Sequence, residues 1–384
     1  YTVTGALCTA DQVTSVTISD TGGGTITYPV TLGLLPPYTI NLPFRVSNTA
    51  AQYSISLTTN GTTGNIFSNT FLAVYPLSSN VAVPLSYSYY DSVGTLAIRS
   101  AELKIGGQSI ETLTGEYIEL WNDLNVPYEN QPALKLLTGK GDNETQILSA
   151  RTYYINLPFY FYNHPELSVP LASLDRQDME IHVTFNTFSN LTSITGVTNP
   201  TLDATIITEY VYLSEPEINW FRSHRVDQVI TQVQYASFTL QPSFTTGVFV
   251  LDFKNPVREM FFVIQVDGTL PFDYSGNGLE SIGLSFNGYE VLNPTTNDSV
   301  SLGSLEPFNH YPNFPTRQFY MHSICIDPTH AKPSGYVNFS RIKQALLTVN
   351  TTGNILPRQL RLAFVSHNVL RFENGLVGLM FNSG

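Results

Sequence analysis

The sequence predicts an all-β protein made of two β domains with a short helical connection between them. Val, Ile, Thr, Tyr and Phe dominate the 384 residues, and turn-forming residues recur at intervals of roughly 8–12 positions, a spacing typical of sandwiches and barrels. Several segments alternate apolar and polar side chains, which places one face of a strand in the core and the other in water. The length suits two such domains.

The clearest strand patterns lie in three segments. In 100–107, Ala101, Leu103 and Ile105 alternate with polar neighbours, and segment 178–185 alternates in the same way. Both segments predict strands of an antiparallel sheet with one dry face. Segment 259–266 (EMFFVIQV) is apolar almost throughout, which predicts a strand buried on both faces.

Two short helices are predicted. Apolar residues recur at intervals of three and four across 111–125, which indicates an amphipathic helix. A second helix starts after Ser214, a favourable N-cap, with Pro216 and Glu217 in its first turn. Strand-rich sequence flanks this helix, so it is predicted to connect the two domains. The expected organisation is an N-terminal arm over 1–37, a first β domain over 38–213, a helical linker over 214–230 and a second β domain over 231–384.

Composition limits the function classes. Only 12% of the residues are charged, about half the usual share, so neutral polar side chains must cover the surface, which suits assembly with copies of the same chain. The net charge is −12 and no segment clusters Lys or Arg, so direct nucleic-acid binding is not expected. Cys8 and Cys325 are too far apart for a disulfide framework or a metal site, and two unpaired buried thiols are predicted. No apolar run approaches the ~20 residues of a membrane span.

Few residues indicate chemistry. His182 shares a strand face with Asp178 and Glu180, which is compatible with a metal or acid–base site, but a solvated strand face is the preferred interpretation. Segment 138–142 (TGKGD) lacks the first glycine of a phosphate-binding loop and predicts a polar hairpin turn instead. The common hydrolase, metalloprotease and calcium-loop motifs are missing from the sequence. No catalytic residue, metal ligand or cofactor is therefore expected.

Six Asn-x-Ser/Thr triplets occur in the chain. Three of them lie in polar, loop-like sequence and are candidate acceptors of glycans: Asn143, Asn190 and Asn297.

Four stretches, in order along the chain, resemble the major capsid proteins of nucleocytoplasmic large DNA viruses. They are 99–124 with Gly106, Gly107, Gln108, Trp121 and Asn122; 155–185 with Leu157, Pro158, Phe159, Phe161, Val169, Pro170 and Leu171; 333–342 with Pro333, Ser334, Gly335, Asn338, Phe339, Ser340 and Arg341; and 367–384 with Asn368, Val369, Leu370, Arg371, Gly375, Gly378 and Leu379. Segment 209–221 also resembles the linker between the two barrels of that family. Residues 1–37 lack the Thr-Phe-Phe-Lys element with which the family usually opens.

The resemblance implies two tandem eight-stranded antiparallel jelly-roll barrels with short helices in the loops and the linker. It implies a structural subunit of an icosahedral virus capsid, which forms pseudo-hexameric homotrimers that tile the shell of the virion and assemble inside the host cell. Neighbouring capsomers, minor capsid proteins, an inner membrane layer and, through outer loops, a host receptor are the implied partners. The alternatives are a minor capsid paralogue, a carbohydrate-binding β-sandwich on a surface, and a β-sandwich or cupin-like enzyme, for which no constellation of ligands or carboxylates is recognisable.

Physical roles are expected for several residues of these stretches. Gly106 and Gly107 suit a tight turn between a strand and a helix. Pro158 and Pro170 are expected to break strands at edges or bulges.

Segment 333–342 carries further expected roles. Pro333 and Gly335 are expected to set a turn, and Asn338 and Ser340 to satisfy backbone groups where the loop re-enters the sheet. Arg341 is expected to pair with a carboxylate or with loop carbonyls.

Overall fold

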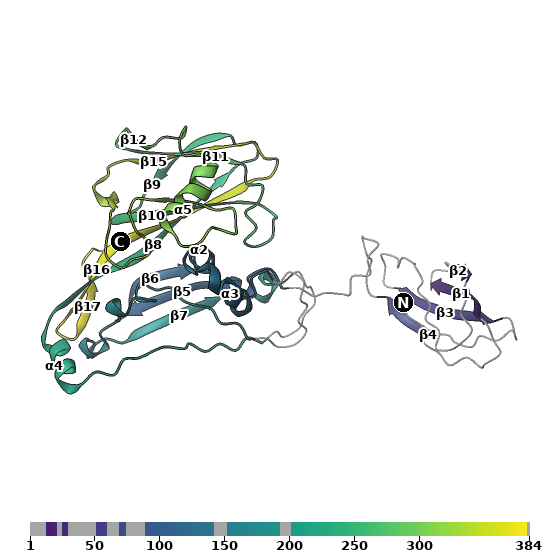
Figure 1. Cartoon of the computed structure of the whole chain (residues 1–384), viewed down its shortest axis with the longest axis horizontal. Helices are drawn as coiled ribbons and strands as arrows, with labels where there is room; N and C mark the ends of the chain where they lie inside the picture. The colour runs from purple at the N-terminus through teal and green to yellow at the C-terminus, as the bar shows by residue number, and fades with distance from the viewer. Residues whose placement is uncertain are drawn as a thin grey trace. The chain divides into compact units, whose positions relative to one another are not determined.

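The chain divides into two compact units, Tyr1–Ser86 and Tyr87–Gly384. A computed structural model describes residues 13–20, 25–29, 51–59, 69–73, 89–141, 152–192 and 201–381 (Figure 1).

The first unit contains a four-stranded antiparallel sheet with the strand order β2-β1-β3-β4. Its strands are β1 (Val13–Asp20), β2 (Thr25–Pro29), β3 (Ala51–Thr59) and β4 (Asn69–Ala73). β1 is central, because Ile18 is paired with Ile26 of β2 on one side and with Ile55 of β3 on the other. Two of these strands, β1 and β2, lie within residues 1–37, the expected N-terminal arm.

The second unit contains three antiparallel sheets. The first has the order β6-β5-β7 and is made of β5 (Ile98–Ile105), β6 (Gln108–Thr114) and β7 (Met179–Phe185). The middle sheet is made of β8 (Val226–Leu240), β10 (Pro256–Val266), β13 (Tyr320–Ser323), β14 (Val337–Asn338), β16 (Arg358–Glu373) and β17 (Leu376–Leu379). The third has the order β12-β11-β15-β9 and is made of β9 (Thr246–Leu251), β11 (Leu279–Phe286), β12 (Tyr289–Leu292) and β15 (Ala345–Thr351).

Short helices occupy the connections. They are α1 (Val93–Ala97), α2 (Gly115–Asn125), α3 (Gln131–Thr138), α4 (Glu215–Ser223) and α5 (Glu306–His310), with 3₁₀ turns at Tyr128–Asn130, Pro165–Leu167, Leu171–Ser173, Phe188–Asn190 and Phe339–Arg341 and a π turn at Ser301–Leu305. The described residues contain no helix that is long and apolar enough to cross a membrane. The unit is therefore dominated by strands.

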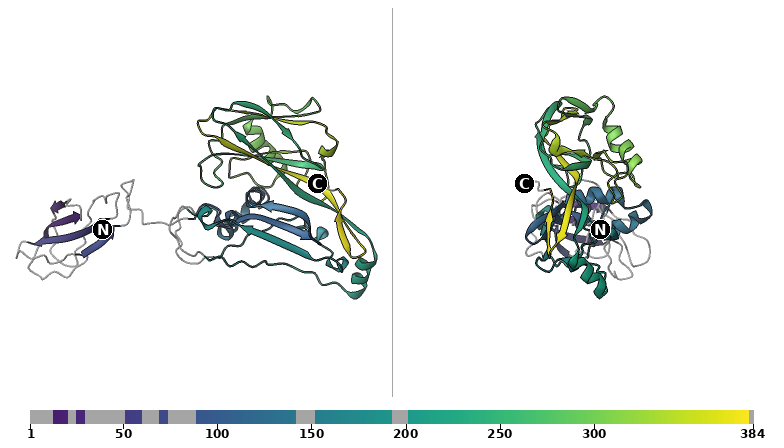
Figure 2. Two further views of the ribbon diagram at one scale, coloured as in Figure 1. Left: turned by 180° about the vertical axis from the view of Figure 1, so that it is seen from behind. Right: turned by 90° about the vertical axis from the view of Figure 1, so that its left-hand side faces the viewer.

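The sheets of the second unit form layers (Figure 1), in the same order when seen from behind (Figure 2). The middle sheet has a hydrophobic core on each side. Residues of β10 alternate between these cores: Met260 and Phe262 join the core shared with β9, β11 and β15, whereas Phe261 and Val263 join the core shared with β5, β6 and α2. The predicted burial of this strand on both faces is confirmed.

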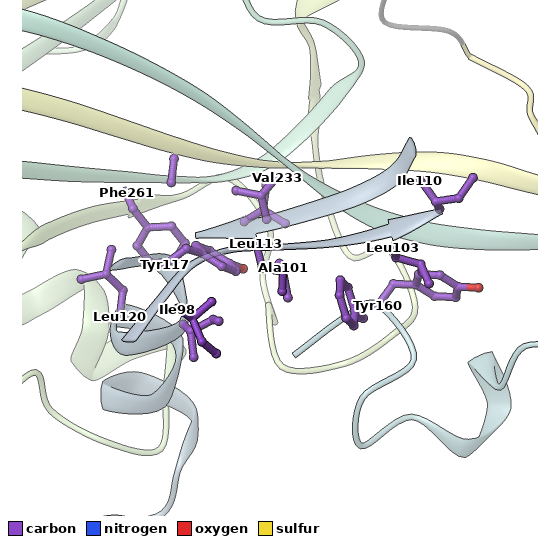
Figure 3. Packing of buried hydrophobic residues seen from close by; sticks show 14 of the residues in the cluster. Ile98, Ala101, Leu103, Ile110, Leu113, Tyr117, Leu120, Tyr160, Val233 and Phe261 are labelled. Carbon is purple, nitrogen blue, oxygen red and sulfur yellow. The ribbon is translucent and has the colours of Figure 1, made fainter. Parts of the chain in front are cut away.

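Figure 3 shows the core on the α2 side, where Leu113, Tyr117 and neighbouring residues lie around Val233 of β8 and Phe261 of β10. The rings of Tyr117 and Phe261 meet edge to face, with centroids 6.1 Å apart. Burying apolar area contributes about 25 cal/mol per Å². Because the middle sheet buries apolar side chains in both cores, the stability of one core depends on the same strands as the stability of the other.

Both predicted helices are present, but their boundaries differ from the prediction. The first part of 111–125 belongs to β6, and α2 begins only at Gly115, where the Thr114 side chain caps the backbone amide of Tyr117 at 3.2 Å. The linker helix is capped as predicted, with Ser214 and Glu217 forming a capping box. It ends at Ser223 and β8 starts at Val226, inside the predicted linker 214–230.

The hairpin turn predicted for 138–142 is wrong. Thr138 is the last residue of α3, and Gly139 is its C-cap in the left-handed conformation, with φ 75°. A glycine ends helices in this way because it has no Cβ to oppose positive φ. The chain then turns inward, so that Lys140 is buried.

Candidate functional site

The described part of the chain holds no group of three or more His, Cys, Asp and Glu side chains that could bind a metal ion. His182 and Glu180 are 2.7 Å apart, but both side chains are about half exposed, as expected for a solvated strand face. Cys325 is buried and unpaired, as predicted, and Cys8 lies outside the described residues. The notable chemistry of this unit is instead in the polar groups buried where α2, β6 and the middle sheet meet.

A cluster of five charged residues joins the two predicted domains. We call it the Arg317 cluster: Asp91, Glu119, Asp123, Lys140 and Arg317. Arg317 lies between α5 and β13, and its guanidinium contacts Glu119 of α2 at 2.9 Å and Asp91 at 3.0 Å. Lys140 contacts Asp123 at 2.6 Å and Glu119 at 3.5 Å. Each buried charge therefore has an oppositely charged partner.

Backbone groups complete the Arg317 cluster. Asp123 accepts hydrogen bonds from the backbone amides of Thr316 and Arg317 at 2.7 and 3.2 Å. Arg317 donates to the Phe272 carbonyl at 3.0 Å, and its guanidinium lies over the ring of that residue. These bonds fix the segment before β13 against α2.

Glu119 and Arg317 favour each other's charged form. Burial alone would raise the pKa of Glu119, but Arg317 and Lys140 overcome this effect, and the pKa of Glu119 is below its usual value. Burial likewise tends to lower the pKa of Arg317, and the nearby carboxylates of Glu119 and Asp91 raise it instead. Removing one member would leave an uncompensated buried charge.

A second ion pair spans the same joint. Arg361 of β16 contacts Glu116 of α2 at 2.6 Å, and the Tyr274 hydroxyl donates to the same carboxylate at 3.0 Å. The Tyr235 hydroxyl of β8 accepts from the backbone amide of Thr114 at 3.2 Å. The residues that join the domains therefore come from β8, the segment around Tyr274 and β16 on one side, and from the β6–α2 junction on the other.

Two further carboxyl groups are buried in this joint, on β6 and β10. Glu111 is 4% exposed and accepts a hydrogen bond from the backbone amide of Tyr160 at 2.9 Å. Burial raises the pKa of Glu111 to about 8, although that hydrogen bond and the Arg258 guanidinium oppose the shift. Glu111 is therefore protonated at neutral pH.

Glu259 is 1% exposed, accepts a hydrogen bond from the Tyr311 hydroxyl and forms an ion pair with Arg258.

The predicted glycine turn lies between two strands and not between a strand and a helix. Gly106 and Gly107 connect β5 to β6 with φ of 58° and 80°. A Cβ at Gly106 would also press against the Gln177 side chain, which would have to move, so the positive φ is the main reason for glycine here.

The second of the four stretches, 155–185, packs against the core shared with β5, β6 and α2. Phe159 is 2% exposed and Pro158 is buried, while Leu157 packs against the core from its edge. Pro158 and Pro170 lie in irregular chain and 3₁₀ turns, and not at strand edges. This stretch also supplies the Tyr160 amide that binds Glu111.

Trp121 and Asn122 of α2 are adjacent in sequence, but their side chains have different surroundings. Trp121 packs edge to face on Tyr162 at 5.4 Å. Asn122 is 1% exposed, and neither polar atom of its side chain has a hydrogen-bond partner among the residues that the structure describes.

The C-terminal predicted residues fasten β16. Asn368 is buried; its amide donates to Gln232 of β8 and to the Phe381 carbonyl, both at 2.7 Å. Arg371 forms a two-point ion pair with Asp227 of β8, at 2.8 and 3.0 Å.

The turn in 333–342 is held largely as expected. The Asn338 side chain accepts from the Ser340 amide at 3.0 Å, and the Ser340 hydroxyl accepts from the Asn255 amide at 2.8 Å. A Cβ at Gly335 would come within 2.8 Å of the Ile324 carbonyl, and Pro333 is exposed. Arg341 departs from the expectation, because it is exposed and makes no ion pair or hydrogen bond with the chain as far as it is described.

The candidate glycan acceptors differ. Asn190 is exposed in a 3₁₀ turn, whereas the side-chain amide of Asn297 donates to the Asn293 carbonyl at 2.9 Å. Asn143 lies outside the described residues. Glycosylation stays a prediction for all three.

The pattern of residues did not predict the role of Arg358. It is fully buried, and its guanidinium donates to the carbonyls of Asn277 and Phe244 at 2.6 and 2.9 Å and to the Thr351 hydroxyl at 2.9 Å. One arginine thus ties the loops at Asn277 and Phe244 to the end of β15.

Replacing Arg358 by lysine is expected to lower the free energy of unfolding by about 1–2 kcal/mol, because a single ammonium cannot reach all three acceptors. Urea denaturation of the variant measures this loss. Arg222→Lys, at an exposed position of α4, is the matched control and should be neutral. Equal stability of both variants would contradict the role given to Arg358.

Comparison with known proteins agrees with this architecture. Residues 46–218 match the family described as major capsid protein N-terminus, and residues 217–378 match the large eukaryotic DNA virus major capsid protein family. The major capsid protein of Pyramimonas orientalis virus is 26% identical over 320 residues, which cover 76% of this chain and 78% of the relative. That of Paramecium bursaria Chlorella virus 1 is 22% identical over 349 residues, which cover 74% and 78%.

Solved structures share the fold. The capsid protein in the PBCV-1 virus capsid gives a TM-score of 0.65 at 17% identity, with 78% of this chain and 88% of that chain covered. The Faustovirus major capsid protein gives 0.58 at 12% identity, with 93% and 85% covered.

The strand-rich unit, with three antiparallel sheets and a hydrophobic core on each side of the middle one, has the fold of the double jelly-roll capsid proteins, and the all-β prediction is confirmed. The chain belongs to the family of major capsid proteins of nucleocytoplasmic large DNA viruses. It is a structural subunit of the capsid shell of the virion, and its relatives are structural proteins and not enzymes.

Proposed function

We propose that this subunit forms homotrimeric, pseudo-hexameric capsomers that tile an icosahedral shell. The observation that carries the proposal is the joint described above, in which the Arg317 cluster and the Glu116–Arg361 pair lock the α2 region to the middle sheet. A subunit that contributes two barrels to a flat capsomer needs such a joint, because a flexible hinge would let the angle between the barrels vary from copy to copy.

We place the first jelly roll at 38–213, the helical linker at 214–230 and the second jelly roll at 231–384, after an N-terminal arm at 1–37. The two matched family segments meet at residues 217–218, inside this linker, which supports the division. The residues of the four stretches act in this proposal as determinants of the fold. Neighbouring capsomers, minor capsid proteins, an inner membrane layer and a host receptor that contacts outer loops are the proposed partners.

Light scattering of the purified chain tests the trimer. The expected mass is three times the 42.6 kDa of one chain, and negative-stain images of the same peak should show a hexagonal outline. A monomer at all concentrations would contradict the homotrimer and favour a minor capsid subunit, which assembles only with other chains.

A further inference from the structure

The turn after β14 is held firmly by its backbone. The Phe339 amide binds the Asn255 carbonyl at 3.0 Å, and the Asn287 side chain accepts from the amides of Lys343 and Gln344 at 3.0 and 3.1 Å. Phe339 is 3% exposed and lies edge to face against Phe286 and Phe364. The turn is therefore fixed from both sides before it meets any partner.

The cations of this turn are nevertheless free. Arg341 and Lys343 are exposed, and neither side chain has an ion-pair partner in the part of the chain that the structure describes. Lys343 borders a hollow of about 560 Å³, together with Ser340 and Ile342, the neighbours of Arg341. Lys254 also borders it, paired with Asp252 at 2.6 Å. Asp252 lines the hollow as well, so Lys343 is the cation of its lining that has no ion-pair partner among the described residues. We call this hollow, together with the exposed Arg341 of the same turn, the basic hollow.

Basic residues are scarce in this chain. The net charge is −12 and only 18 of 384 residues are Lys or Arg. Identical copies therefore repel each other at long range, and each copy presents many exposed carboxylates. A local basic site offsets this repulsion and orients the approaching copy. Arginine is also a frequent anchor of interfaces, and here the backbone that carries it is already fixed, so the turn loses little freedom when it binds.

From the rigid turn, the unpartnered cations and the acidic chain, we infer that the basic hollow is a contact between copies within the capsomer, where it binds carboxylates of a second copy. This inference rests on the homotrimer proposed above. The contact accounts for the exposed side chain of Arg341. The side chains of its neighbours Asn338 and Ser340 form hydrogen bonds that hold the turn, whereas that of Arg341 forms none with the residues that the structure describes.

Zero-length cross-linking tests the contact directly. Chains labelled with ¹⁴N and ¹⁵N are mixed during assembly, and a carbodiimide then joins Lys amines to carboxylates within contact distance as amides, with loss of water. We expect peptides of mixed isotope that contain Lys343 joined to Asp or Glu. Cross-links of Lys343 only within one isotope, from a trimeric protein, would overturn the inference and leave the trimer intact.

Charge reversal gives an independent readout. Arg341→Glu with Lys343→Glu is expected to weaken self-association by about tenfold or more. Lys135→Glu with Arg222→Glu is the control, with the same change of net charge at exposed positions of α3 and α4. Equal loss in both double variants would overturn the inference. An unaltered chain that stays monomeric would overturn both this contact and the homotrimer.

Discussion

Replacing Arg317 by methionine is expected to lower the free energy of unfolding of the chain by about 3–5 kcal/mol. The substitution removes the contacts at 2.9 Å to Glu119 and at 3.0 Å to Asp91. Glu119 is 1% exposed and would keep only the more distant Lys140 as a positive neighbour. Chemical denaturation measures the loss.

Two further variants make this test specific. Arg225→Met removes an exposed ion pair with Asp227 and should cost no more than about 1 kcal/mol. Glu119→Gln added to Arg317→Met should recover part of the loss, because it removes the buried charge left without its main partner. An Arg317 variant as stable as the Arg225 control would show that the cluster does not hold the domains together.

Glu111→Gln is expected to stabilise the chain at neutral pH by up to about 3 kcal/mol. The folded state holds a proton on Glu111 up to a pKa of about 8, above the ordinary value of 4.5, so the unfolded state binds fewer protons between these pH values. Stability contributed by the protonated group is complete below about pH 4.5 and is lost as the pH rises to about 8, at roughly 1.4 kcal/mol per pH unit. Glutamine keeps the acceptor for the Tyr160 amide and cannot ionise.

Urea denaturation between pH 4.5 and 8.5 measures the effect of Glu111. The difference between the variant and the unaltered chain should be small at the acidic end and grow with pH. Glu290→Gln, at an exposed position of β12, should show no such growth. A Glu111 variant that is less stable by a constant amount at every pH would show that the carboxyl group is ionised in the folded chain.

The periodic elements could be predicted from the sequence because their patterns are local. β10 has apolar residues at successive positions, and Ser214 and Glu217 form a capping box within four residues. Boundaries were less accurate where a strand runs directly into a helix, as at Thr114, because apolar residues of β6 also fit the helical interval.

The joint between the domains could not be predicted in the same way. Glu116, Glu119 and Asp123 recur at helical spacing on α2, and this is the one local signal of a buried acidic face. Arg317 is 198 residues from Glu119 and Arg361 is 245 residues from Glu116, and no local pattern connects them. Lys140 was missed because its short polar segment resembles a surface turn, whereas the glycine that ends α3 turns it inward.

The alternating side chains of β10 have a consequence for how the polypeptide acquires its structure. Phe261 and Val263 face a core whose other wall is made by β5, β6 and α2, all of which are synthesised earlier. The chain from Val226 onward therefore supplies only part of this core: Phe272, Tyr274 and Phe319 are its own contribution, and the wall made by β5, β6 and α2 lies upstream. A nascent subunit that reaches β10 already has the other wall of that core available, so the order of synthesis favours completing the joint before the C-terminal strands are made.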